Sequence, residues 1–271
     1  MTSLFNLQVD APSLRQFDNG KVFLPADDVK LKDMTTVEMV DMFWKYINTL
    51  QVLCRNQTRV GSLKDGGKEV CIDEQYKPRV PCLVYSFGQV SNFQFDFEMD
   101  IVKKFGCEVH TFDPSREITS KVKIPSEINY HLVGLYDSNT IIKDGWKVNN
   151  LSNIRKELHH ERRVVDILKI DVEGAEWQAL PAMFKSGVLK YVKQICIEIH
   201  FGQCKPGGKI FGGVSIQHQL STLRQLYLHG FHIFIHEHNL KALDKLRFNY
   251  EGITSVNEIS LINVKWNING D

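Results

Sequence analysis

Short apolar segments alternate with helical segments from Arg79 to the C-terminus, and this alternation limits the fold more than any other feature of the chain. The apolar segments contain few polar residues, which is typical of strands buried on both faces. We predict strands at 80–87, 108–112, 130–135, 164–170, 194–200, 231–236 and 258–264. We predict helices at 93–105, 151–160, 175–184 and 215–229. This alternation favours an α/β fold whose mostly parallel sheet is covered by helices on both faces.

The N-terminal part of the chain has a different pattern. Thr35 or Thr36 can cap a helix that carries Glu38 in its first turn. Apolar residues then recur at helical spacing and predict a packing face, which comprises Val37, Val40, Phe43, Trp44, Ile47, Leu50 and Leu53. A polar, glycine-rich loop is expected after this helix. We therefore predict a helical N-terminal extension over residues 1–75, packed on a main domain over residues 76–271.

The charge balance and the apolar segments exclude two classes of partner. The chain has 33 Lys and Arg residues against 32 Asp and Glu residues, a net charge of +1, which argues against a broad nucleic-acid-binding surface. No apolar segment approaches the ~20 residues that span a bilayer. The first 13 residues do not resemble a signal peptide, so the chain is either cytosolic or a targeting segment has been removed from it. Glycosylation triplets at Asn56 and Asn150 agree with a secretory setting.

Five of the six cysteines fall into two groups. Three of them lie in strand-like apolar segments and are predicted to be buried free thiols: Cys82, Cys107 and Cys196. Cys54 and Cys71 instead flank the glycine-rich loop and could form a disulfide, which would imply an oxidising compartment. No pair has the CxxC spacing typical of zinc sites.

Ligands of open α/β sheets bind at the carboxyl ends of the strands, so the residues that follow each strand are the informative ones. Gly88 follows the first predicted strand and permits a sharp turn and a close approach of the main chain, although the three-glycine dinucleotide fingerprint is absent. Asp113 follows the second strand, near the spacing of about 20 residues at which a carboxylate meets ribose hydroxyls. Alternatively, Asp113 forms a turn before Pro114.

A second group of polar residues follows the fourth and fifth predicted strands. Asp171 ends the fourth strand and should point into the crevice, whereas Glu173 and Glu176 can also cap the next helix. Glu198 and His200 occupy alternate positions of the fifth strand and therefore share one face. Histidine is the usual general base near neutral pH, and the alternative for His200 is a buried core residue. We predict His200, Asp171 and Glu198 as the catalytic residues.

Two further segments are candidates for ligand contacts. His236 and His238 suggest a metal site, but a polar loop explains them equally well. Asn239 could hydrogen-bond a polar substrate. The glycines between residues 207 and 213 predict a flexible loop that could close over the crevice.

The chain resembles the methyltransferase-like protein 24 family, one of the FkbM-type S-adenosylmethionine-dependent methyltransferases, in the segments VYSFGQVSNFQFD, HTFDPS, ILKIDVEGAEW, QICIEIHF and HEHNL. The resemblance covers roughly residues 50–265. It implies a class I (Rossmann-like) methyltransferase fold, a three-layer sandwich around a mostly parallel seven-stranded sheet with an antiparallel last strand. It also implies methyl transfer to oxygen, with sugars as frequent acceptors, and the Golgi lumen of the secretory pathway as the compartment.

The resemblance also implies the position of the cofactor. The residues implied to contact S-adenosylmethionine are Tyr85, Ser86, Phe87, Gly88, Ser91, Asn92 and Asp113, with the adenine near Leu135. The residues expected to contact the acceptor are Glu173, Trp177, His238 and Asn239.

The sequence therefore predicts an S-adenosylmethionine-dependent O-methyltransferase that acts on a sugar hydroxyl of a glycan. We expect His200 to act as general base, with Glu198 or Asp171 orienting either the base or the acceptor. In a variant of this hypothesis, Asp171 and Glu198 hold a divalent metal that lowers the pKa of the hydroxyl. The alternatives are a methyltransferase of small molecules or proteins, or a catalytically silent relative that binds cofactor or glycan. A nicotinamide-dependent oxidoreductase is disfavoured because its usual three-glycine turn is absent.

Overall fold

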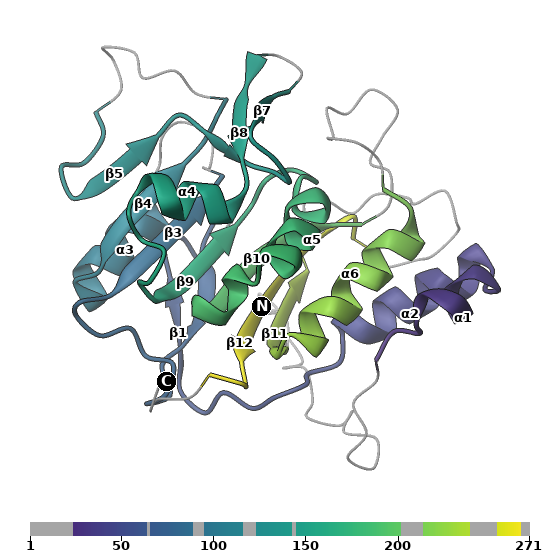
Figure 1. The fold of residues 1–271 in the computed structure, drawn as a ribbon. Helices are drawn as coiled ribbons and strands as arrows, with labels where there is room; N and C mark the ends of the chain where they lie inside the picture. The colour runs from purple at the N-terminus through teal and green to yellow at the C-terminus, as the bar shows by residue number, and fades with distance from the viewer. Residues whose placement is uncertain are drawn as a thin grey trace, which may run out of the picture.

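The computed structural model describes residues 24–63, 66–88, 95–115, 123–142, 145–201, 214–238 and 254–266. Its centre is a seven-stranded sheet in the order β11-β12-β10-β9-β3-β4-β5 (Figure 1). The strands are β3 (Leu83–Phe87), β4 (Glu108–Phe112), β5 (Ile128–His131), β9 (Val165–Ile170), β10 (Val192–His200), β11 (Phe231–His238) and β12 (Val256–Asn263). β12 is antiparallel to both of its neighbours, whereas the pairs from β10 to β5 are parallel. The predicted class I methyltransferase architecture is confirmed.

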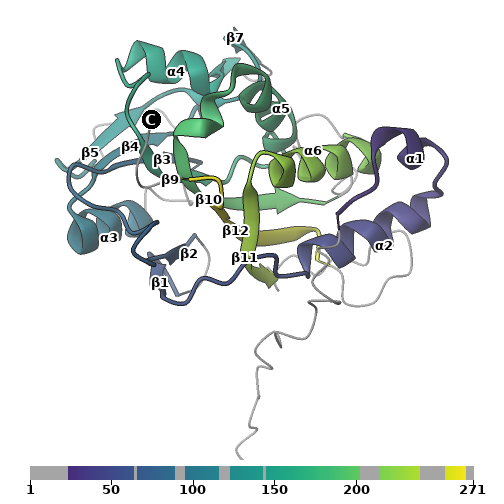
Figure 2. The ribbon, with the colours of Figure 1, turned by 60° about the horizontal axis from the view of Figure 1, so that its bottom comes forward.

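One face of the sheet is covered by helices α4 (Leu151–Glu157), α5 (Glu176–Ser186) and α6 (Ile216–Leu228), as Figures 1 and 2 show. The sheet presents its largest side chains to this layer, since alternate residues of a strand point to opposite faces. They form the main core with α5 and α6: Tyr85, Phe87, Phe112, Leu168, Ile170, Ile195, Ile197 and Ile199. Each such side chain contributes about 1.5–3 kcal/mol on burial.

Helices α1 (Asp28–Lys32) and α2 (Thr36–Ile47) pack against α6. Thr35 caps α2 as predicted, since its Oγ1 accepts from the N–H of Glu38 (3.3 Å) while Glu38 Oε2 accepts from the N–H of Thr35 (2.7 Å). The buried side chains of α2 are Val40, Phe43, Tyr46 and Ile47. Val37 and Leu53 are exposed, so the predicted apolar stripe is wrong at both of its ends.

The opposite face of the sheet is covered by α3 (Asp96–Phe105) and by a hairpin of β1 (Gln57–Val60) and β2 (Lys68–Cys71), which Figure 2 shows beside each other. The predicted glycine-rich loop is therefore wrong in part, because its two ends pair as strands. Val60 and Val70 of the hairpin pack with Ile101 of α3. The buried Gln194 of β10 fastens the hairpin to the sheet, since its side chain accepts from the N–H of Cys71 (2.8 Å) and donates to the Cys71 carbonyl (2.9 Å).

The predicted strand at 130–135 is divided between two sheets. Its first part belongs to β5, whereas Gly134–Leu135 (β6) pairs with β8 (Lys147–Asn149). β8 also pairs with β7 (Thr140–Ile141), and the three strands form a separate small sheet.

Two disulfides connect neighbouring segments. The predicted Cys54–Cys71 bond is confirmed and closes the base of the hairpin. Cys82 and Cys107 also form a disulfide, so their prediction as free thiols is wrong. They directly precede the adjacent parallel strands β3 and β4, and this places their Cα atoms 4.7 Å apart, within the range that a disulfide requires. Cys196 is a buried free thiol, as predicted.

The predicted boundary between residues 75 and 76 stays a prediction. In the described part of the chain, no helix combines the length and the apolar character that a membrane span needs.

Candidate active site

Gly88 marks the point at which the strand order reverses. β3 lies between β4 and β9, and the chain crosses from one side of β3 to the other at this edge. The N–H of Gly88 donates to the carbonyl of Phe112, and the N–H of Asp171 donates to that of Phe87, both at 2.9 Å. Gly88 has a φ of 78°, and a Cβ at this position would lie 1.5 Å from the Asp171 carbonyl oxygen. Only glycine is compatible with this contact, and the switch point faces the crevice in which α/β folds bind ligands.

Asp113 follows β4 at the same edge of the sheet. Its Oδ1 accepts hydrogen bonds from the N–H (2.8 Å) and the hydroxyl (2.7 Å) of Ser115, so the turn that was the alternative for Asp113 is present. This turn holds the carboxylate beside the switch point. A ribose contact by Asp113 stays a prediction, and it is compatible with the turn, since a carboxylate has about four acceptor positions.

Two of the implied cofactor residues turn their side chains into the helix-covered core. Tyr85 is buried, and its hydroxyl lies 2.7 Å from Nδ1 of His160. The Phe87 ring stacks on Phe112, with ring centroids 4.5 Å apart. Contacts of Tyr85 and Phe87 with a ligand would therefore have to come from their main chain.

The remaining implied cofactor residues have different surroundings. Ser86 faces the other side of the sheet, where its hydroxyl donates to Oε1 of Glu98 in α3 (2.5 Å). Leu135 is buried in β6. Ser91 and Asn92 lie outside the described residues.

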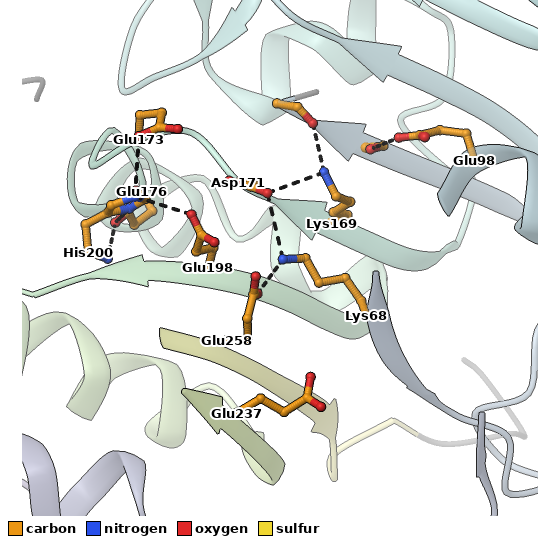
Figure 3. A network of polar contacts seen from close by, with 12 residues as sticks. Lys68, Glu98, Lys169, Asp171, Glu173, Glu176, Glu198, His200, Glu237 and Glu258 are labelled. Carbon is orange, nitrogen blue, oxygen red and sulfur yellow. Dashed lines mark hydrogen bonds and ion pairs between the residues drawn. The ribbon is translucent and has the colours of Figure 1, made fainter. Parts of the chain in front are cut away.

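A row of acidic residues crosses four neighbouring strands at the carboxyl edge of β9 and β10 (Figure 3). Asp171 follows β9 beside Glu198 of β10, because Ile170 pairs with Ile197. Glu198 is directly opposite Glu258 of β12, which is opposite Glu237 of β11. Like charges placed opposite one another destabilise a sheet, so this row needs compensating groups.

Two lysines supply the compensating charge. Lys68 of β2 is almost completely buried; its Nζ bonds to Oε2 of Glu258 and lies 3.8 Å from Oδ2 of Asp171. Lys169 of β9 lies 3.9 Å from the same oxygen and donates to the Gly88 carbonyl (2.8 Å). Burial alone would raise the pKa of Asp171, but the two lysines hold it below its usual value. Sequence reasoning missed Lys68 because it belongs to the segment predicted as a loop.

Glu198 differs from Asp171 because the effect of burial on its pKa is not outweighed by the nearby lysines. Burial, together with the charge of Asp171, raises the pKa of Glu198 to about 8. Asp171 therefore carries the negative charge of this pair, whereas Glu198 binds a proton at neutral pH. The structure brings together the three predicted catalytic residues, since Glu198 Oε1 also lies 3.4 Å from His200 Nε2.

His200 is held by a buried carboxylate. Oε1 of Glu176 accepts from the N–H of His200 (2.8 Å) and lies 3.0 Å from its Nδ1, and Oε2 of Glu176 accepts from the N–H of Gly174 (2.8 Å). Burial alone would lower the pKa of His200, but the neighbouring Glu176 and Glu198 raise it well above the usual value. This raised pKa favours the protonated imidazolium of His200, whereas a general base acts in its unprotonated form.

The residues predicted to contact the acceptor differ in their exposure and in their distance from His200. Glu173 has a left-handed φ of 55°, which leaves its carboxylate 71% exposed and 3.6 Å from His200 Nε2. Trp177 is buried in the core, and its Nε1 donates to the His200 carbonyl (2.8 Å). Trp177 thus helps to position the main chain of His200 and does not lie on the surface that an acceptor would contact. His238 is exposed at the end of β11, and Asn239 and the glycines of 207–213 lie outside the described residues.

Among the described residues, two groups have three ligating atoms close enough together for a metal ion, and neither includes Asp171, Glu198 or His236. In one group, the thiols of Cys54 and Cys71 are joined to each other. The ammonium of Lys68 stands between Asp171 and Glu258 and compensates part of their charge. Asp171 and Glu198 thus have no third protein ligand among the described residues, and the metal variant of the mechanism stays a prediction.

The strand order, the Gly88 turn and the row of acidic residues define a class I methyltransferase-type protein. A family model described as a methyltransferase domain matches residues 28–250, so the chain belongs to this family. The chain is 27% identical over 245 residues to probable methyltransferase-like protein 24 of Homo sapiens. The aligned segment covers 83% of the chain and 64% of the relative. It is 28% identical over 251 residues to the protein of the same name in Rattus norvegicus (84% and 66%). The chain thus spans just under two thirds of the length of these relatives. No solved structure matches it significantly.

Proposed function

We propose that this chain is an S-adenosylmethionine-dependent O-methyltransferase that methylates a sugar hydroxyl of a glycan or glycoconjugate. The observation that carries the proposal is the group of Asp171, Glu198 and His200 at the carboxyl edge, directly beside the Gly88 switch point. Membership of a methyltransferase-domain family and the names of the relatives support methyl transfer as the reaction class.

The residues at the switch point fit the cofactor. S-adenosylmethionine, when bound, supplies a methyl group on a positively charged sulfur. The main chain of residues 85–88 would contact its methionine end, and Asp113 would accept hydrogen bonds from the ribose hydroxyls. Ser91, Asn92 and Leu135 remain expected contacts.

We assign removal of the acceptor proton to Glu198. An alkyl hydroxyl is a poor nucleophile, and a base that takes its proton makes it a better one. The pKa of Glu198 is raised to about 8, so its ionised form is a stronger base than an ordinary carboxylate and is accessible near neutral pH. The His200 imidazolium, held by Glu176, donates toward Glu198 and orients it. This assignment differs from the sequence expectation that His200 is the base.

The charge around the site favours a neutral acceptor. Glu173 extends an exposed carboxylate above His200, whereas Glu237 at the outer strand is paired with Arg59. Carboxylates accept hydrogen bonds from hydroxyl groups and repel phosphate. A polyhydroxyl acceptor such as a sugar therefore suits this surface better than an anionic one.

The test is methyl transfer from labelled S-adenosylmethionine across a glycan array, with the methylated position mapped by mass spectrometry. Wild-type protein should label a subset of glycans, and Glu198→Gln should reduce turnover by about 10²–10⁴-fold, the usual contribution of a general base. Glu237→Gln, at the exposed end of the acidic row, is the matched control. Labelling of proteins or small molecules in place of glycans would overturn the acceptor class, and undiminished turnover by Glu198→Gln would overturn its role.

We also propose that the protein acts in the lumen of the secretory pathway. The Cys54–Cys71 and Cys82–Cys107 bonds support this because disulfides persist in oxidising compartments and are rare in the cytosol. Protein isolated from its native cells without reductant should gain four mass units on full reduction. No mass gain would place it in a reducing compartment.

A further inference from the structure

We infer a binding site for a divalent transition-metal ion of the zinc type, formed by Glu108, His110 and His160. Oε1 of Glu108 lies 2.8 Å from His110 Nε2 and 3.7 Å from His160 Nε2, and the three ligand atoms all lie within 4.8 Å of one another. Ligands at zinc bond lengths of about 2.0–2.1 Å in a tetrahedron are about 3.3 Å apart. Small side-chain adjustments would therefore bring this group to coordination distance.

Both histidines are oriented by a partner on their other ring nitrogen. Nδ1 of His110 lies 2.9 Å from Nε2 of His131, and Nδ1 of His160 lies 2.7 Å from the hydroxyl of Tyr85. The His110 and His131 rings also stack, with an interplanar angle of 5°. Metal-ligating histidines are commonly held in this way through the nitrogen that does not bind the metal. Here both Nε2 atoms are left on the side of Glu108.

Arg163 is the group with which a metal would compete. Its Nη1 donates to Glu108 Oε2 (2.7 Å) and lies 3.1 Å from His160 Nε2. The guanidinium is about one third exposed, so it can leave His160 and remain on Oε2 or turn into the solvent. Arg163 thus lowers the metal affinity but does not block the site.

The proposed metal site is separate from the group of Asp171, Glu198 and His200. Glu108 is the first residue of β4, at the amino end of the strand, whereas the catalytic group follows the carboxyl ends of β9 and β10. His160 belongs to the connection between α4 and β9. A metal here would join β4 to that connection and would act on stability and not on the chemical step. Three protein ligands leave a fourth position for water.

The test is calorimetry of chelator-treated protein with Zn²⁺, together with the visible spectrum of the Co²⁺ form. We expect one ion per chain, a tetrahedral Co²⁺ spectrum and a raised melting temperature with metal. Glu108→Gln and His160→Gln should weaken binding by about 10–100-fold or more. Arg163→Gln should tighten it, an effect that a structural role alone for these residues would not produce.

The control is His232→Gln, which removes a half-buried histidine far along the chain from the site and should leave the affinity unchanged. Circular dichroism verifies that each variant folds, and Glu108, being partly exposed, is the safest position to change. Absence of binding to the wild-type protein overturns the inference. So does binding of equal strength by the wild type, Glu108→Gln and Arg163→Gln, since the ion would then bind elsewhere.

Discussion

Replacing Lys68 with methionine tests whether the hairpin supplies an essential charge to the acidic row. Methionine keeps most of the side-chain length and removes the ammonium. Lys68 is 2% exposed and bonds to Glu258, with Asp171 3.8 Å away. Without it, these carboxylates would have to remain charged in a buried environment or take up protons.

The size of the effect follows from burial. Removing one partner of a buried ion pair costs about 3–5 kcal/mol, because the other charge is left uncompensated. Lys169 stays near Asp171 but is 3.9 Å away and already donates to the Gly88 carbonyl, so it compensates only in part. We therefore expect Lys68→Met to lower the free energy of unfolding at pH 7 by about 3 kcal/mol or more. The loss should shrink as the pH falls toward 4, because protonation removes the unpaired charges.

The assay is urea unfolding at both pH values, with a double-mutant cycle. Glu258→Gln in the Lys68→Met background should restore stability, with a coupling energy of about 0.5–3 kcal/mol. Glu237→Gln is the control, since its ion pair with Arg59 is more exposed and is expected to contribute about 1 kcal/mol or less. A loss for Lys68→Met at pH 7 no larger than that for the control, or a loss that does not shrink at pH 4, would refute the reasoning.

Three further predictions concern the site and its support. Turnover should rise as the pH increases through about 8, where Glu198 loses its proton, and a Glu198→Gln variant with the same rising limb would contradict this. Asp113→Asn keeps an acceptor for the turn and should weaken S-adenosylhomocysteine binding about tenfold, equal to the loss of about 1.4 kcal/mol; unchanged affinity by calorimetry would remove Asp113 from the cofactor site. Replacing both Cys54 and Cys71 with serine opens a closed segment of 17 residues and should cost about 3 kcal/mol in urea unfolding, whereas a loss below 1 kcal/mol would show that the hairpin docks without the bond.

The strands and most helices could be predicted from the sequence because local signals agree with the fold. β4 matches the predicted range at 108–112, and β9 differs by one residue, since both are apolar and end at a polar residue. The Thr35 cap was readable from the spacing between Thr35 and Glu38. These features depend on neighbours in the chain.

The hairpin and the second disulfide could not be predicted because they depend on neighbours in space. β1 and β2 have four residues each and mixed polarity, so their strand signal is short. The bond between Cys82 and Cys107 requires β3 and β4 to be adjacent and parallel, and the spacing of the two cysteines does not contain this information.

The residues of the candidate site could be predicted from the sequence, but their pKa values could not. The positions of Asp171, Glu198 and His200 follow from strand alternation and from the rule for strand ends. The pKa of His200 depends on Glu176, which the sequence presents only as a possible cap of the next helix, and that of Asp171 depends on Lys68, which is far along the chain. Such shifts need the three-dimensional arrangement of charges.

Calorimetry with S-adenosylhomocysteine tests the central claim most directly, because every proposed role of the acidic edge depends on a cofactor at the Gly88 turn. The wild-type protein should bind one molecule per chain. Gly88→Val, which must displace the Asp171 carbonyl, should abolish the binding heat. Absence of binding to the folded wild-type protein would contradict the methyltransferase proposal.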